Sequence, residues 1–249
     1  MSSVPHRAHR LSLERIAQAA GVIDPVFLDS PQYRAEPLEA GLDGRLIVKV
    51  ETLNPIRSFK GRGTEHLCAT LEGRPHLVCA TAGNFGQGMA WSARRRGLAI
   101  TIFAATTANP MKVERMRALG AEVRLEGDDV DLAHDAARAF AEARGARLVE
   151  DGRDVAIAEG AATIAIELLR GPESIEALLV PVGDGALIGG IARWTKAHAP
   201  AIRVIGVCAS GRRRWSARGA PGGSWSRGRP IRSRTGSRCA RPIRKRSPT

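Results

Sequence analysis

Asn54-Pro55-Ile56-Arg57-Ser58-Phe59-Lys60-Gly61-Arg62-Gly63 follows an apolar, strand-like run and leads into a helix-like segment. Pro55 disfavours helix immediately before it, and Ser58 is a suitable N-cap for the helix that follows. Lys60 is therefore expected in the first turn of a helix, where the partial positive charge of the helix start disfavours an ammonium group. Such a setting favours a neutral, nucleophilic amine that can form an imine with an aldehyde. A solvated surface lysine is the alternative interpretation, because most lysines are exposed.

Two further stretches share a strand–turn–helix pattern that is rich in glycine. The first is Thr81-Ala82-Gly83-Asn84-Phe85-Gly86-Gln87-Gly88, and the second is Val180-Pro181-Val182-Gly183-Asp184-Gly185-Ala186-Leu187-Ile188-Gly189-Gly190. Backbone N–H groups in such turns can bind an anion. The sequence therefore predicts two anion-binding turns in addition to the lysine.

Strand-like and helix-like segments alternate through the middle of the chain. This alternation predicts an α/β fold with open, twisted, mostly parallel sheets that carry helices on both faces. Right-handed crossovers place the turn after each strand at the carboxyl edge of its sheet, so the turns at Asn84 and Gly183 are expected to face one cleft. Strands are expected at residues 45–51, 76–80, 99–104, 122–125, 147–150, 175–182 and 203–208.

The three stretches, in this order, resemble the fold-type II pyridoxal-phosphate enzymes of the tryptophan synthase β-like family. That family includes threonine and serine dehydratases, serine racemases and cysteine synthases. The resemblance runs from about Asp29 to about Cys208 and is strongest to the dehydratases, through SFKGRG, TAGNFGQGMA and VPVGDGALIGGIA. It implies a larger cofactor-binding domain from residues 1–75 and 151–210, which is incomplete, and a smaller mobile domain from residues 76–150.

The resemblance also implies roles for individual residues. Lys60 would hold pyridoxal 5′-phosphate as an imine and then act as general base, and Asn84 would hydrogen-bond the ring hydroxyl of the cofactor. The substrate carboxylate would be received by Thr81, Ala82 and Gly83. The cofactor phosphate would lie in the turn formed by Gly183, Asp184, Gly185, Ala186 and Leu187. No metal is implied.

Three residues depart from the family pattern. Asp184 stands where related enzymes have glycine, and a carboxylate that pointed inward would repel a phosphate dianion. Ala82 replaces the serine that serves the racemases as a second base, which favours elimination over racemisation. Phe85 follows Asn84 where histidine is common, and this leaves the substrate preference open.

The implied reaction is an α,β-elimination of the dehydratase or ammonia-lyase type on a small hydroxy amino acid such as threonine or serine. The incomplete fold makes an inactive product one alternative, and β-replacement of the cysteine synthase type is another. A nucleotide-binding enzyme is a weaker alternative, because Gly183, Gly185 and Gly189 do not have the dinucleotide spacing and Lys60 would be left unexplained. The family also implies a homodimer.

The basic charge of the chain is concentrated at its end. The net charge is +13, and residues 211–249 hold 12 Arg and one Lys without Asp or Glu. Subtracting these 13 from the 38 basic residues leaves 25, against 25 acidic residues. We expect this tail to be disordered. It is either an arm that binds RNA or another polyanion through charge, with Trp215 and Trp225 stacking on bases, or translation in a shifted reading frame, which we favour because the implied fold is unfinished.

The four cysteines include no Cys-x-x-Cys pair, and Cys68, Cys79 and Cys208 lie in apolar contexts that predict buried free thiols. No apolar run has the length of a signal peptide or a membrane span. These features predict a cytoplasmic protein that binds no membrane. The small amino-acid substrate is what the family resemblance implies. Nucleic acid is expected to bind at most non-specifically, through the tail.

Overall fold

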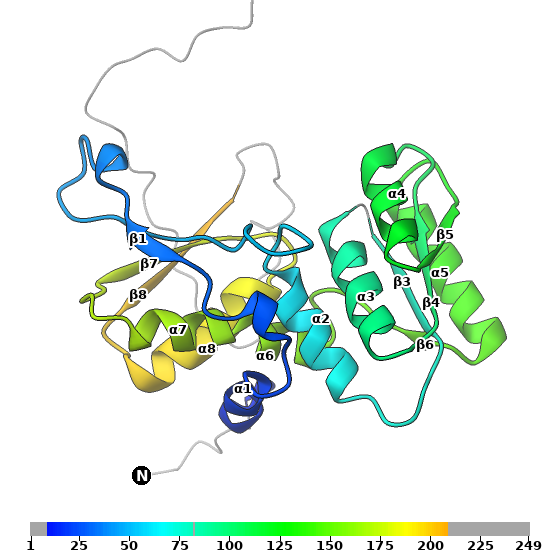
Figure 1. Cartoon of the computed structure of the whole chain (residues 1–249), viewed down its shortest axis with the longest axis horizontal. Coiled ribbons are helices and arrows are strands. Elements are labelled where there is room, and N and C mark those ends of the chain that lie inside the picture. The colour runs from blue at the N-terminus through cyan, green and yellow to red at the C-terminus, as the bar shows by residue number, and fades with distance from the viewer. Residues whose placement is uncertain (1–8, 82, 209–249) are drawn as a thin grey trace, which may run out of the picture. The chain divides into compact units, whose positions relative to one another are not determined.

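The structure is a computed structural model that describes residues 9–81 and 83–208. It contains three separate sheets among these residues (Figure 1). The strands are β1 (Gln32–Arg34), β2 (Ile47–Lys49), β3 (Leu77–Ala80), β4 (Ile100–Ala104), β5 (Glu122–Leu125), β6 (Arg147–Leu148), β7 (Ala177–Pro181) and β8 (Arg203–Val207). The helices are α1 (Leu13–Ala19), α2 (Lys60–Ala69), α3 (Asn84–Arg95), α4 (Pro110–Ala118), α5 (Val130–Arg144), α6 (Val155–Ala161), α7 (Thr163–Arg170) and α8 (Ala186–His198), with short 3-10 helices at Pro25–Phe27 and Glu36–Leu38.

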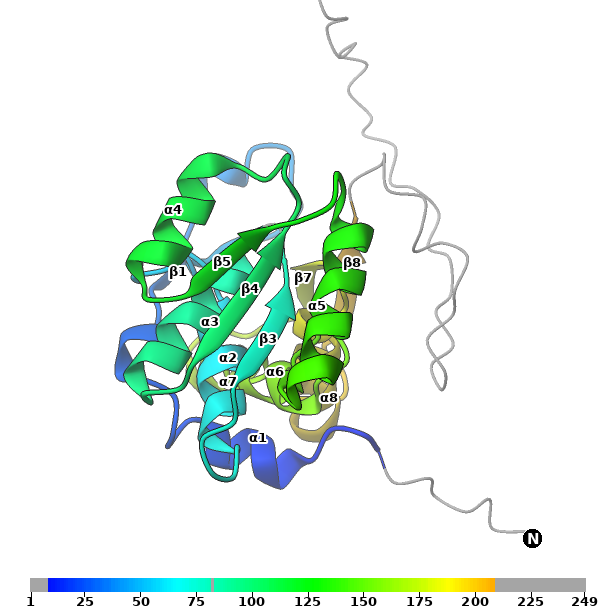
Figure 2. The same cartoon turned by 90° about the vertical axis from the view of Figure 1, so that its right-hand side faces the viewer.

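The four-stranded sheet has the order β5-β4-β3-β6, and all of its neighbouring strands are parallel. Figure 2 shows α5 on one side of this sheet and α3 and α4 on the other. Val78 and Phe103 pack against α5, whereas Leu77, Cys79 and Ile102 belong to the core formed with α3 and α4. This arrangement confirms the predicted α/β fold with a mostly parallel sheet covered on both faces.

The strands β7 and β8 form a second, parallel pair that packs on α7 and α8. Their other face is open among the described residues, where Leu179, Ile205 and Val207 are 63%, 39% and 49% exposed. Cys208 follows β8 and is exposed, so the prediction of a buried thiol was wrong there; Cys68 and Cys79 are buried free thiols, as expected. The thiol of Cys208 lies at the end of a strand whose outer face no described residue covers.

The third sheet is an antiparallel pair of β1 and β2. The strand expected at residues 45–51 is confirmed as β2. Its partner β1 was not among the expected strands, because it lies in a segment rich in Pro and Asp, residue types that favour loops. The division into a larger domain and a mobile smaller one stays a prediction, although residues 77–148 supply every strand of the four-stranded sheet. The predictions for the tail lie outside the described residues. None of the helices in residues 9–81 and 83–208 has the length and apolar character that crossing a membrane requires.

Helix α2, which carries Lys60, is buried along most of its length. It begins at Lys60, so Lys60 lies in the first turn as expected, and the Oγ of Ser58 accepts the N–H of Lys60 at 3.3 Å although Phe59 rather than Ser58 holds the N-cap position. Gly63 and Gly160 allow α2 and α6 to touch: a Cβ at Gly63 would lie 2.5 Å from the carbonyl oxygen of Ile157. This close packing fixes the direction in which α2 starts.

A buried ion-pair network anchors the same helix. Arg62 is fully buried, and its guanidinium donates to Glu51 at 2.8 Å and 2.9 Å and to Glu167 at 2.5 Å and 3.0 Å. Ion pairs between a buried guanidinium and two carboxylates are costly to break, because removing one partner leaves the other as an unpaired buried charge. The network therefore holds the first turn of α2, and Lys60 with it, in one orientation.

Candidate functional site

The Lys60 ammonium lies between two carboxylates. Its Nζ is 2.5 Å from Oδ2 of Asp151 and 2.7 Å from Oδ2 of Asp184, and its side chain is only 11% exposed. The aromatic rings of Phe59 and Phe85 lie 4.9 Å and 6.0 Å from the same nitrogen. The alternative of a solvated surface lysine is therefore wrong.

The partners of Lys60 come from three distant parts of the chain that converge at the carboxyl ends of strands. Asp151 follows β6, Asp184 lies in the turn between β7 and α8, and Phe85 belongs to the first turn of α3. The structure thus brings the lysine together with both glycine turns, as parallel sheets do with the loops at their carboxyl edges. Asn84 is the first residue of α3 and is exposed, and no hydrogen bond joins its side chain to another described residue.

The two carboxylates differ in their proton affinity. Burial, together with the charge of Asp184, raises the pKa of Asp151 to about 7, although the Lys60 ammonium acts in the opposite direction. Burial also acts to raise the pKa of Asp184, but its hydrogen bonding with Asp151 and the charge of Lys60 outweigh burial, and that pKa is lowered. Asp151 is therefore the member of the pair that takes up a proton near neutral pH, and its Oδ1 is buried without a partner among the described residues.

The second glycine turn carries its own anion. Asp184 points inward, and while its Oδ2 contacts Lys60 its Oδ1 accepts the N–H of Ala186 at 2.8 Å. Gly185 has a φ of +100°, a conformation that favours glycine, and it opens helix α8. A carboxylate thus occupies the start of a helix, the position that binds anions through backbone N–H groups and the helix dipole.

The donor set at this turn fits a phosphate group, provided that Asp184 moves. Within the described part of the chain, the N–H groups of Leu187 and Ile188 have no hydrogen-bond partner, and a Cβ added at Gly183 would meet no atom within 4 Å. The Asp184 carboxylate links the lysine amine to this helix start, so both groups lie within reach of one small ligand. The residues therefore fit a ligand that has an aldehyde and a phosphate, and Asp184 stands in for the phosphate.

A lysine side chain that was not predicted from the sequence lies over the first glycine turn. Thr81 is buried, and its Oγ1 accepts the N–H of Gly83 at 3.1 Å, whereas Ala82 lies outside the described residues. A Cβ at Gly83 would lie 2.8 Å from Nζ of Lys112, so the Lys112 ammonium lies directly over this turn. No ion pair or hydrogen bond engages this ammonium within residues 9–81 and 83–208. One signal was present in the sequence: Lys112, like Lys60, stands in the first turn of a helix, where cations are disfavoured.

Fold and site together define an α/β protein with a lysine amine enclosed where the carboxyl ends of parallel strands meet. The chain belongs to the family of pyridoxal-phosphate-dependent enzymes, whose model matches residues 23–248. This membership confirms the resemblance drawn from the three sequence stretches. The family uses pyridoxal 5′-phosphate, which is the ligand with an aldehyde and a phosphate that the site fits.

Relatives within the family are similar over most of this chain. The chain is 37% identical over 188 residues to threonine dehydratase 1 of Solanum lycopersicum, covering 73% of this chain and 31% of the relative. It is 34% identical over 200 residues to the L-threonine ammonia-lyase of Thermotoga maritima, covering 79% and 50%. The solved structure of processed threonine deaminase isoform 2 from Solanum lycopersicum superposes with a TM-score of 0.72 at 31% identity, covering 79% and 56%. The chain thus spans about a third to a half of these curated relatives.

Proposed function

We propose that this chain carries the lysine half of a pyridoxal-phosphate site for α,β-elimination from a small hydroxy amino acid. The observation that carries the proposal is the enclosed Lys60 amine, joined through Asp184 to the open start of α8. The relatives reported above carry the names threonine dehydratase and L-threonine ammonia-lyase, which supports threonine, or the smaller serine, as substrate.

Each residue of the site has a proposed task in holding the cofactor. Lys60 supplies the amine that bonds to the cofactor aldehyde, and Asn84, in the first turn of α3, donates to the oxygen of the ring hydroxyl. The phosphate is held by backbone N–H groups, with Asp184 turned away from its present position. These groups belong to the turn of Gly183, Asp184, Gly185, Ala186 and Leu187.

The bound cofactor supplies an electron sink for the carbanion character that develops at the substrate α-carbon. The chain supplies the proton transfer and the orientation. Lys60 Nζ is the base that takes the α-proton, and Asp151, whose pKa is raised to about 7 by burial, is placed 2.5 Å from that nitrogen to exchange a proton with it. The substrate carboxylate is received by Thr81 and the backbone at Ala82 and Gly83, with Lys112 as counter-ion.

A purified sample tests the cofactor site directly. We expect the protein to develop an absorbance band at about 400 nm with pyridoxal phosphate, and borohydride to abolish it, because an imine with Lys60 is reducible. Lys60→Ala should lack the band, and Lys196→Ala, which removes a lysine on the last turn of α8, should keep it. Identical spectra for Lys60→Ala and wild type would exclude the proposed site.

Release of ammonia and a 2-oxo acid from threonine or serine tests the reaction. β-Replacement is the second candidate reaction, and formation of a new β-substituted amino acid from an added thiol would favour it. The chain covers only part of the length of its relatives. If the chain is inactive, we expect it to bind the cofactor without turnover. A homodimer, a cytoplasmic location and polyanion binding by residues 211–249 stay predictions.

A further inference from the structure

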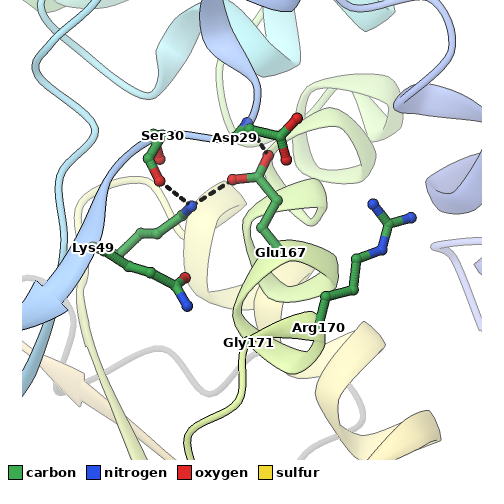
Figure 3. A pocket seen from close by; sticks show the side chains of 7 residues that line it. Asp29, Ser30, Lys49, Glu167, Arg170 and Gly171 are labelled. Carbon is green, nitrogen blue, oxygen red and sulfur yellow. Dashed lines mark hydrogen bonds and ion pairs between the residues drawn. The ribbon is translucent and has the colours of Figure 1, made fainter.

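A second pocket lies apart from Lys60, beside the β1–β2 pair and the end of α7 (Figure 3). Its volume is about 250 Å³, and its lining is formed mainly by charged and amide side chains rather than by apolar ones. Neither Lys60 nor its partners Asp151 and Asp184 belong to this lining. The pocket is therefore distinct from the proposed cofactor site.

The floor of the pocket is a closed set of ion pairs. Lys49 Nζ lies 2.5 Å from Glu167 and donates to the carbonyl oxygen of Ser30 at 2.6 Å, and the Lys49 and Glu167 side chains are only 9% and 8% exposed. Glu167 also accepts from Arg62, and although burial acts to raise the pKa of Glu167, the bonds from Arg62 and Lys49 lower it. The floor charges satisfy one another, so a ligand has to be recognised by the rim.

The rim carries two charges of opposite sign that no described residue neutralises. The Asp29 carboxylate and the Arg170 guanidinium make no ion pair or hydrogen bond among the described residues, and both residues are exposed. Figure 3 shows these two side chains on the same side of Glu167, without a dashed contact to either charged group. The neutral amide of Gln32 completes the rim, with its Nε2 against Gly171.

Asp29 is also held in an unusual backbone conformation. Its φ is +46°, one of two such non-glycine values in the described chain, and its N–H donates to Glu167 at 2.9 Å. Residues in this region cost energy and persist where the surrounding structure holds them, often at binding sites. The contact with Glu167 thus holds the backbone of Asp29 at the rim.

We propose that this pocket binds a free α-amino acid as its zwitterion, with the ammonium group on Asp29 and the carboxylate on Arg170. A zwitterion satisfies both rim charges, whereas a simple anion would face Asp29 and a simple cation would face Arg170. Guanidinium–carboxylate pairs are among the strong, geometrically defined hydrogen-bonded pairs. The small volume restricts the ligand to a small side chain.

Glycine is the simplest probe, because it is the minimal zwitterion and has no β-leaving group for the proposed reaction. Backbone amide shifts are followed by NMR on the full chain, and the Lys60→Ala variant is titrated in parallel. We expect glycine to shift the amides of Ser30 and Gly171 with a dissociation constant of about 1 mM or tighter. The same shifts should occur in Lys60→Ala, so the result does not depend on the proposed cofactor site.

Two rim variants and two control variants test the assignment of charges. Asp29→Asn keeps a residue that tolerates positive φ, and Arg170→Gln keeps a polar side chain; each should weaken glycine binding by about tenfold or more. Asp43→Asn and Arg203→Gln change exposed charges outside the pocket and should leave the affinity unchanged.

Single-charge probes distinguish a zwitterion site from a simple ion site. Acetate and methylammonium should each bind at least about tenfold more weakly than glycine, because each leaves one rim charge unpaired. The proposal is overturned if glycine causes no shift at Ser30 or Gly171 up to about 50 mM, or if acetate binds as tightly as glycine. Equal glycine affinities for wild type, Asp29→Asn and Arg170→Gln would overturn it as well.

Discussion

Replacing Asp184 with glycine tests whether the carboxylate competes with a phosphate for the start of α8. In the structure the Asp184 carboxylate accepts two hydrogen bonds that bear on ligand binding, from Lys60 at 2.7 Å and from the Ala186 N–H at 2.8 Å, in addition to its hydrogen bonding with Asp151. A phosphate bound at the same turn needs the Ala186 N–H and repels the nearby carboxylate. Asp184→Gly therefore removes the competitor and restores the residue type that the family pattern has at this position.

The size of the effect follows from the two hydrogen bonds. Each involves a charged partner and contributes about 1.5–3 kcal/mol. A bound phosphate replaces the contact with Ala186, so the loss on displacing Asp184 is close to that of one such bond, or about 2 kcal/mol. Because 1.4 kcal/mol corresponds to a factor of ten, we expect Asp184→Gly to tighten binding of pyridoxal phosphate by about 30-fold.

Two measurements monitor the expected change in affinity. Titration of the absorbance band at about 400 nm gives the affinity for the whole cofactor. Equilibrium dialysis with inorganic phosphate reports on the turn alone and needs neither imine formation nor turnover. Asp43→Gly, in an exposed loop, is the matched control and should change neither affinity.

Asp184 does not compete with phosphate if Asp184→Gly binds both ligands as weakly as wild type, or more weakly. Tighter phosphate binding with an unchanged absorbance titration would confine the competition to the turn and contradict the link from Asp184 to Lys60. Thermal unfolding of the unliganded proteins separates affinity from folding, because the loss of two hydrogen bonds lowers the stability of the variant.

Three further predictions concern neighbouring residues. Gly190→Ala should lower the free energy of unfolding by more than about 2 kcal/mol, because its Cβ would lie 2.2 Å from the carbonyl oxygen of Ala158, whereas Gly189→Ala, with open space around it, should raise it by about 0.5–1 kcal/mol in urea unfolding. The raised pKa of Asp151, about 7 against 3.8, means that its stabilising contribution is complete below about pH 4 and lost as the pH rises through 7. The free energy of unfolding of Asp151→Asn, measured with urea, should therefore rise relative to that of wild type by a few kcal/mol across that pH range. A difference between the two proteins that does not change with pH would contradict the raised pKa. Lys112→Gln should raise the KM for threonine about tenfold with little change in kcat, and an unchanged KM in steady-state kinetics would remove Lys112 from the carboxylate site.

Local sequence signals located much of the fold. Asn109 and Pro110 marked the start of α4, and the structure shows Asn109 accepting the N–H of Met111 at 2.9 Å. Gly145 marked the end of α5, where it adopts φ +59°. The strand at residues 122–125 was predicted with the bounds that the structure has. Helix caps, glycines at helix ends and apolar runs act within a few residues, so they can be recognised in the sequence without the tertiary structure.

Features that depend on packing were not predicted. The apolar spacing of residues 159–169 favours one continuous helix, but the structure divides this region into α6 and α7 at Ala162, and alanine gives no local signal for a break. The glycine-rich residues 83–88 favour a turn, but helix α3 already begins at Asn84, because tertiary contacts bury Phe85 and its neighbours. Burial against other elements overrides the weak local preferences at these positions.

The site shows the same division between local and long-range information. Lys60 and the two glycine turns could be found from short motifs, but the contacts of Lys60 with Asp151 and Asp184 span 91 and 124 residues. The sequence marked Asp184 as a departure from the family without showing where its carboxylate points. Asp151 could have been suspected only from its place directly after an expected strand.

The inward position of Asp184 changes what family membership predicts for this turn. Resemblance alone assigns the turn to a phosphate and marks the acid as a departure, without showing where its carboxylate points. If the carboxylate pointed to solvent, Asp184→Gly would change the affinity little. The contacts with Lys60 and Ala186 instead make the acid an internal anion that holds both the amine and the helix start. Cofactor binding is then an exchange of one anion for another, and the affinity of a single glycine variant distinguishes the two accounts.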